Sequence, residues 1–178
     1  ERIREGSRFP VATTGSDSNP GTADLPFLTI AKAMSLSSTV FLPGDTITVR
    51  GGTYPATVTI SISKNGTGSA RCYLLAYPGE RALLDFSAMA VGSSNRGVNL
   101  KGNYWYVRGL DIQGAGDNGM IVSGSNNIIE FCSFFENRDT GLQLAGGASL
   151  NQVINCDSYA NADPDHGDAD GFAPKLDV

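Results

Sequence analysis

Three segments in the second half of the chain repeat one pattern at a nearly constant spacing. Val107, Ile129 and Val153 hold the same place in successive units, at steps of 22 and 24 residues. Each unit has a short apolar strand, a polar turn, a glycine and a second alternating segment. A unit this short cannot bury its apolar face alone, so neighbouring units must stack on one another. The spacing therefore predicts a solenoid.

The length of the repeat discriminates between kinds of solenoid. Units of 22 to 24 residues are too short for a four-stranded propeller blade, and they lack the LxxLxL spacing of leucine-rich repeats. They suit an all-β fold, the parallel β-helix, in which each coil packs its apolar side chains on those of the next. We expect this fold over residues 11–178, with regular coils from about residue 45, and we expect residues 1–10 to be a flexible segment or non-native residues.

Alternation within the second strand of each unit predicts which side chains face the core. The inward positions are Met120, Val122, Leu142, Leu144 and Phe172, and the outward positions are Gln143 and Ala173.

Only residues 27–37 have helical spacing. The expected apolar face of this helix consists of Leu28, Ile30, Ala31 and Met34. Because an open solenoid end exposes core and unpaired strand edges, it needs a cover. We expect the short helix to cap the amino-terminal end.

The formal net charge of the chain is -5. An acidic chain of this kind argues against nucleic acid and anionic membranes as partners, because both need concentrated Lys and Arg. The charge suits a divalent cation instead. No apolar stretch approaches the roughly 18 to 20 residues that span a bilayer, and the first ten residues lack the apolar segment of a signal peptide. We expect a monomer that binds neither nucleic acid nor membrane.

The three cysteines, Cys72, Cys132 and Cys156, have no CxxC spacing, and their odd number excludes a complete set of disulfides. We expect them to behave as small hydrophobic side chains. Cys132 and Cys156 fall on adjacent coils, where packing is favoured over a bridge because parallel side-chain directions oppose one.

Two further patterns concern the interior of the coils. Asn127 and Asn151 lie one period apart and predict a ladder of side-chain amides. Trp105 could be part of a sugar-stacking platform or part of the core, and the alternation of the strand favours the core.

An acidic insertion interrupts the third unit. The step from Gly141 to Gly171 is 30 residues, about eight longer than the step before it, and the surplus lies in residues 161–170. Insertions in one coil of a solenoid form loops on one face, commonly the binding face. The insertion holds four aspartates and the only histidine, His166. On spacing alone it is either a metal site or a solvated acidic loop, since it does not follow the EF-hand pattern.

Two stretches resemble known proteins. The opening "VATTGSDSNPGTADLPFLTIAKAMS…PGDTITVRGGTY" resembles the amino-terminal capping region of secreted right-handed β-helix proteins. The later "NRDTGLQL…NQVINCDSYANADPDHGDADGFAPK" resembles the central coils of family 9 polysaccharide lyases, the pectate lyases, and its "ADGFAPK" part is the more specific. The resemblance implies a secreted, right-handed β-helical lyase that cleaves polygalacturonate by β-elimination with Ca2+ and a lysine base.

For the site, the resemblance implies that Asp170, the aspartate of "ADGF", is a metal ligand. The family's other aspartate ligands and its lysine base have no counterpart before Val178, so we expect a chain truncated at its carboxy-terminal side, and the catalytic residues stay unassigned. We expect Lys175 to be a surface residue rather than the base, and His166 to be solvated.

Two other functions remain open from the sequence. One is a lyase or hydrolase acting on another polyuronate, such as alginate or a rhamnogalacturonan. The other is a non-catalytic solenoid that binds polysaccharide or a cell surface.

Overall fold

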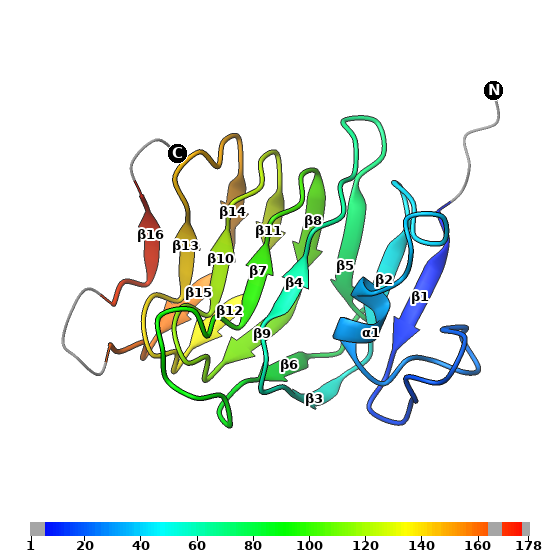
Figure 1. Ribbon diagram of the computed structural model, residues 1–178, viewed down its shortest axis with the longest axis horizontal. Helices are drawn as coiled ribbons and strands as arrows, with labels where there is room; N and C mark the ends of the chain where they lie inside the picture. The colour runs from blue at the N-terminus through cyan, green and yellow to red at the C-terminus, as the bar shows by residue number, and fades with distance from the viewer. Residues whose placement is uncertain (1–5, 164–168, 176–178) are drawn as a thin grey trace.

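A computed structural model describes residues 6–163 and 169–175. Within this part of the chain, one helix and sixteen strands form a solenoid in which most coils contribute one strand to each of three parallel sheets (Figure 1). Sheet A consists of β1 (Arg8–Val11), β2 (Thr46–Val49), β5 (Cys72–Ala76), β8 (Trp105–Arg108), β11 (Ile128–Glu130) and β14 (Gln152–Ile154). Sheet B consists of β3 (Gly52–Pro55), β6 (Ala82–Asp85), β9 (Leu110–Gln113), β12 (Ser133–Phe135) and β15 (Asp157–Tyr159). Sheet C consists of β4 (Ile60–Ile62), β7 (Val98–Leu100), β10 (Met120–Val122), β13 (Leu142–Leu144) and β16 (Phe172–Pro174). The predicted parallel β-helix is confirmed.

The register of sheet A follows the sequence repeat. Ile129 pairs with Val107 on one side and with Val153 on the other. Val107 and Ile129 are fully buried, whereas Val153 is 37% exposed because it lies in the last described strand of its sheet. The predicted row of stacked side chains is therefore confirmed.

Single residues in the left-handed region bend the chain between sheets. Between sheets A and B the bend falls at Gly109, Phe131 and Asn155 in successive coils, with φ of 77°, 51° and 49°. Glycine adopts this conformation without strain, whereas a residue that has a Cβ atom is sterically strained in it. Leu150 takes the same conformation just before β14, with φ of 56°. The solenoid thus accepts local backbone strain at its corners.

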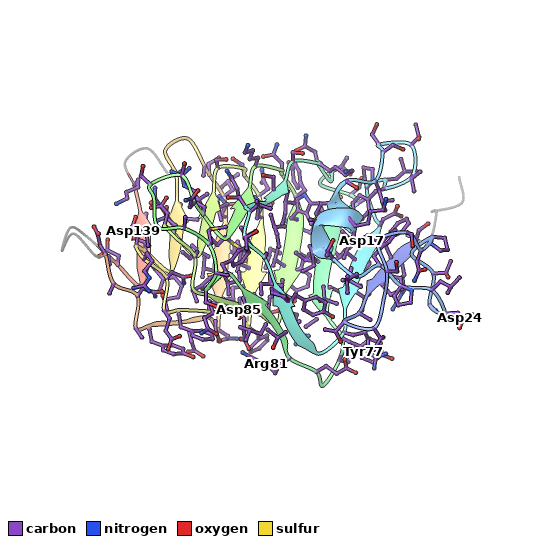
Figure 2. The ribbon with its side chains drawn as sticks, turned by 60° about the horizontal axis from the view of Figure 1, so that its bottom comes forward. Asp17, Asp24, Tyr77, Arg81, Asp85 and Asp139 are labelled. Atoms are coloured by element: carbon purple, nitrogen blue, oxygen red, sulfur yellow. The ribbon has the colours of Figure 1, made fainter. Side chains whose placement is uncertain are left out.

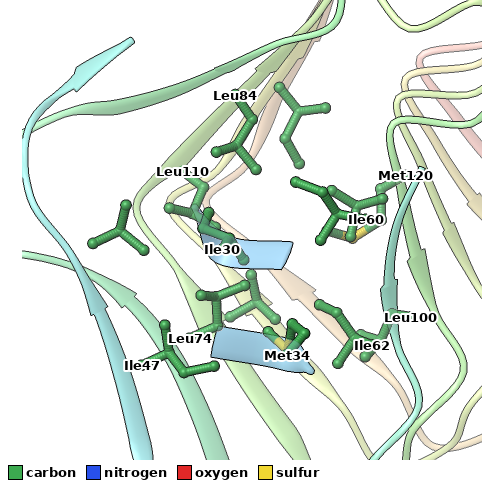
Figure 3. Close-up of a cluster of buried hydrophobic side chains, with 14 of the residues drawn as sticks. Ile30, Met34, Ile47, Ile60, Ile62, Leu74, Leu84, Leu100, Leu110 and Met120 are labelled. Atoms are coloured by element: carbon green, nitrogen blue, oxygen red, sulfur yellow. The ribbon is translucent and has the colours of Figure 1, made fainter. Parts of the chain in front are cut away.

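The amino-terminal end of the core is covered by α1 (Ile30–Met34), as predicted. Thr29 caps this helix, its Oγ1 accepting a hydrogen bond from the backbone N–H of Lys32 at 3.0 Å. Figure 3 shows Ile30 and Met34 packed among aliphatic side chains of the first coils. No helix within residues 6–163 and 169–175 is long and apolar enough to cross a membrane.

The predicted apolar face of this helix is partly wrong. The buried residues are Ile30, Ala33 and Met34, while Leu28 is 40% exposed and Ala31 is exposed. The cap at Thr29 places Leu28 before the first turn, so the inward face starts at Ile30 and continues at the third and fourth positions after it.

The first strand begins earlier than the boundary expected from the sequence. The flexible segment expected over residues 1–10 does not include residues 8–10, because the structure pairs Arg8–Val11 of β1 with Thr46–Val49 of β2. Backbone hydrogen bonding to a neighbouring strand therefore brings these residues into sheet A.

In β16 the exposure of two side chains differs from the prediction. Phe172 is 43% exposed although its ring contacts Phe134 edge-to-face at 6.4 Å, and Ala173 is only 4% exposed. The alternation of β16 is thus correct for Phe172, which points toward the interior. Its ring is uncovered because β16 is the terminal strand of sheet C.

Asparagine ladders join the coils, as the spacing of Asn127 and Asn151 predicts. Asn151 Oδ1 accepts from the N–H of Asn127 at 2.9 Å, and Asn127 Oδ1 accepts from the N–H of Trp105 at 2.8 Å. A second ladder, which we did not predict, links Asn161 Oδ1 to the N–H of Asn137 at 3.1 Å. These side chains satisfy backbone donors that the turns leave outside the sheets.

Trp105 belongs to the core, as predicted. It is fully buried, its ring stacks on Phe41 at 5.7 Å, and its indole N–H donates to the Lys64 carbonyl at 2.7 Å.

Cys72, Cys132 and Cys156 are free thiols. Burial raises the pKa of the Cys72 thiol to about 11, which keeps it protonated and unreactive.

Candidate functional site

Polar side chains gather in the turns that lead into the strands of sheet C. We call this region the leading edge of sheet C, and it comprises residues 95–97, 117–119, 139–141 and 169–171. The backbone sets its register, because Gly119 N–H donates to the Thr140 carbonyl and Gly141 N–H donates to the Asp170 carbonyl, at 2.9 and 3.0 Å. Residues far apart in the sequence therefore lie in consecutive rows along this edge.

Asp170, the predicted metal ligand, lies in the last of these rows. Its side chain is exposed, and its backbone is held on both sides. Its N–H donates to Thr140 Oγ1 at 3.3 Å, and its carbonyl accepts from Gly141. The carboxylate is therefore presented to solvent from a fixed backbone.

Backbone freedom at Gly171 does not account for the outward placement of Asp170. This glycine lies outside the left-handed region, where the freedom of glycine would matter. A Cβ atom built there would lie 3.5 Å from the side chain of Ser158, an ordinary contact. The position of Asp170 at the edge of the sheet is sufficient to expose it.

A buried carboxylate lies two coils before Asp170. Asp117 is only 8% exposed, and its Oδ2 lies 3.3 Å from Arg96 Nε in an ion pair. The pKa of Asp117 is raised to about 6, mainly by burial; Arg96 lowers it and the negative charge of Asp139 raises it, and the value of about 6 is the net result. The leading edge thus contains a carboxyl group that titrates near neutral pH.

The next carboxylate, Asp139, is oriented by amide and hydroxyl donors. Asn118 Nδ2 donates to Asp139 Oδ2 at 3.0 Å and also approaches Gln143 Oε1 at 3.2 Å. Thr140 Oγ1 donates to Asp139 Oδ1 at 3.2 Å. In Figure 2 Asp17 and Asp24 lie at the capped end of the solenoid, and Asp139 lies at the opposite end. The polar edge is therefore remote from the cap.

Sequence reasoning missed the grouping of Arg96, Asp117 and Asp139. A signal was present, because Asp117 and Asp139 are separated by the repeat step of 22 residues. The contact with Arg96 gives no such signal, since it depends on how two turns fold back beside each other.

The described residues do not by themselves make a calcium site. Ca2+ takes six to eight oxygen ligands, yet no group of three or more His, Cys, Asp or Glu side chains within the described ranges could hold a metal ion. The predicted solvation of His166 concerns a residue outside those ranges. Lys175 is partly buried and follows β16, where its N–H donates to the Leu144 carbonyl at 3.0 Å.

The fold and its polar edge define a parallel β-helix protein with an extended surface built from successive coils. A family described as Pel9A-like, right handed beta helix region, matches residues 9–178. The chain belongs to this family, which confirms both the predicted handedness and the resemblance to family 9 pectate lyases.

Individual relatives agree with this membership. Pectate lyase L of Paenibacillus polymyxa is 48% identical over 180 residues, covering 94% of this chain and 39% of the relative. Pectate lyase L of Dickeya chrysanthemi is 38% identical over 178 residues, covering 94% of this chain and 41% of the relative. The crystal structure of pectate lyase Pel9A matches with a TM-score of 0.83 and 32% identity, covering 96% of this chain and 44% of that chain. The chain thus spans about two fifths of the length of these relatives.

Proposed function

We propose that the chain forms the amino-terminal part of the β-helix of a secreted polysaccharide lyase that cleaves polygalacturonate. Membership in a family whose relatives are named pectate lyases carries this proposal. The exposed carboxylate of Asp170, held on a fixed backbone within the "ADGFAPK" motif, supports it. An acidic polysaccharide is the partner that we assign to the polar edge.

The proposed reaction is a β-elimination. A base removes the C5 proton of a uronate residue, the electron pair forms the C4=C5 double bond, and the C4–O bond breaks with departure of the oxygen. Negative charge accumulates next to a carboxylate that is already anionic, so the reaction needs cationic stabilisation at that place. Ca2+ is the cofactor that we propose for this role.

Asp170 is the residue of this chain that we propose as a calcium ligand. Because one carboxylate cannot fill the coordination sphere of Ca2+, further ligands must come from outside the described residues. We assign no residue of this chain as the base, and a positioned base contributes about a hundredfold to ten-thousandfold to a rate. The 178-residue chain alone should therefore bind polygalacturonate weakly and not cleave it.

The test compares this chain with a longer chain from the same source. Both are incubated with polygalacturonate, alginate and rhamnogalacturonan at millimolar Ca2+, and ultraviolet absorbance reports the unsaturated product. We expect the longer chain to act on polygalacturonate and to lose activity with Asp170→Asn, which keeps the size of the side chain. A longer chain that binds polygalacturonate without turnover would favour a non-catalytic solenoid.

A further inference from the structure

A cavity of about 320 Å³ opens beside the turn between sheets B and C. Its polar lining includes Ser87, Gln113, Glu136 and Arg138, and its apolar lining includes Met89 and Val91. This volume lies at the lower end of the range for small-ligand sites and suits about one or two sugar residues. The mixture of donors, acceptors and apolar surface is typical of a site for a pyranose ring.

Arg138 differs from other arginines of the solenoid. Arg50, Arg81 and Arg108 form ion pairs with Glu80, Asp111 and Glu130 respectively. The structure records no ion pair or hydrogen bond of the Arg138 guanidinium with any residue that it describes. The Arg138 side chain is exposed, while its backbone N–H is fixed to the Ala115 carbonyl at 2.9 Å. A positive charge is thus available at the cavity.

The carboxylate of Glu136 is already engaged at the same cavity. Gln113 Nε2 donates to Glu136 Oε2 at 2.7 Å, which fixes an amide and a carboxylate side by side. A carboxylate held in this way still accepts hydrogen bonds from hydroxyl groups. The cavity can therefore contact both the hydroxyl groups and the acid group of a uronic acid.

The cavity adjoins the leading edge of sheet C. Arg138 precedes Asp139 and Thr140 in one turn, and Thr140 Oγ1 accepts from the N–H of Asp170. The carbonyl of Asn137, which also lines the cavity, accepts from Ala162 N–H at 2.9 Å. One acidic chain crossing this turn could therefore reach the cavity and Asp170 together.

We propose that this cavity is a subsite for one uronate residue of an acidic polysaccharide, with the Arg138 guanidinium pairing with the sugar carboxylate. Met89 and Val91 contact the C–H face of the ring, and Ser87, Gln113 and Glu136 contact its hydroxyl groups. The inference rests on the proposed function, because it names how the same site holds its substrate. Arg138 is a binding residue in this scheme and takes no part in proton transfer.

The test uses the 178-residue chain and the trisaccharide of galacturonate, followed by backbone amide shifts in two-dimensional NMR. Arg138→Gln removes the charge, Arg138→Lys keeps it, and Lys101→Gln is the control because it removes one positive charge from an exposed position after β7. We expect saturable shifts at Gly114 and Ala162. Arg138→Gln should weaken binding about tenfold or more, as expected for loss of a charge-assisted contact. Arg138→Lys should restore part of the affinity. Lys101→Gln should change the affinity by less than about twofold, because exposed distant charges are screened.

Three results would overturn the subsite: equal affinity of Arg138→Gln and the unchanged chain, equal binding of the neutral galactose trisaccharide, or the absence of saturable shifts at Gly114 and Ala162. The lyase assay on the longer chain separates this outcome from failure of the proposed function. An active longer chain that is indifferent to Arg138→Gln at limiting substrate would remove the subsite and leave the function. An inactive longer chain with intact trisaccharide binding at the cavity would remove the lyase activity alone.

Discussion

Asn127 Oδ1 accepts a hydrogen bond of 2.8 Å from the backbone N–H of Trp105, which lies 22 residues earlier in the preceding coil. The same amide donates through Nδ2 to the Gly102 carbonyl at 3.0 Å. Asn127 is fully buried, so water cannot replace either bond. One side chain therefore joins the turn and the strand of the neighbouring coil.

Replacing Asn127 by Ala should lower the free energy of unfolding by about 2 to 6 kcal/mol, because two buried backbone groups lose their partners at about 1 to 3 kcal/mol each. Urea unfolding followed by the fluorescence of Trp105 measures this change. Asn151→Ala provides the control, since Asn151 is only partly buried and should cost less. Equal losses for the two variants would show that the ladder does not depend on burial.

Gly141 should tolerate no side chain. A Cβ atom there would lie 2.0 Å from Ser158 Oγ and 2.9 Å from the Gly171 carbonyl oxygen. These two atoms are themselves joined by a hydrogen bond of 2.7 Å, so the clash would break a link between coils. We expect Gly141→Ala to destabilise the fold by about 1 to 3 kcal/mol, measured by thermal unfolding.

Gly171→Ala is the matched control in the next coil, where the nearest contact of the new Cβ atom would be 3.5 Å. It should change the stability by less than about 0.5 kcal/mol. A larger loss from Gly171→Ala than from Gly141→Ala would contradict the packing described here.

Asp117 should make the stability depend on pH. Its pKa in the fold is raised from 3.8 to about 6, so the folded chain holds this proton more tightly than the unfolded chain. The resulting stabilisation is complete below about pH 4 and is lost as the pH rises through about 6, with an upper limit of about 3 kcal/mol. Urea unfolding at a series of pH values measures the slope.

Asp117→Asn cannot titrate and should remove this part of the pH dependence. Arg96→Gln should move the loss to higher pH, because Arg96 lowers the pKa of Asp117. An unchanged slope in Asp117→Asn would assign the pH dependence to other groups.

Leu150 occupies a strained corner. It has φ of 56° and a side chain that is 77% exposed, so its leucine side chain gains little packing in return. Asn tolerates the left-handed region better than Leu, and Asn126 holds the equivalent corner one coil earlier with φ of 60°. Leu150→Asn should raise the unfolding free energy by about 0.5 to 1 kcal/mol, measured in urea. Leu150→Val, which is β-branched, should lower it, and the opposite order would argue against strain at this corner.

The spacing of apolar residues determined the fold class. Because stacked coils must align their apolar side chains, a constant step between Val107, Ile129 and Val153 is sufficient to predict their pairing in sheet A. The same reasoning predicted the amide ladder of Asn127 and Asn151. It would also have found Asn137 and Asn161, which are 24 residues apart.

Features that depend on ends and corners could not be predicted in this way. The inward face of α1 follows from the cap at Thr29, which excludes Leu28 from the helix. The exposure of Phe172 follows from its place in the terminal strand of sheet C. Both depend on where an element begins or ends, which periodicity does not specify.

In the candidate site, too, some features could be predicted from the sequence and others depend on the tertiary structure. The "ADGF" motif singled out Asp170 from the sequence. The raised pKa of Asp117 and the charge of Arg138, which has no ion-pair partner among the described residues, emerge only when turns of neighbouring coils come together. Periodicity reports which residues share a row, because rows repeat along the sequence. Burial and charge pairing across rows depend on distances in space. Only the tertiary structure determines those distances.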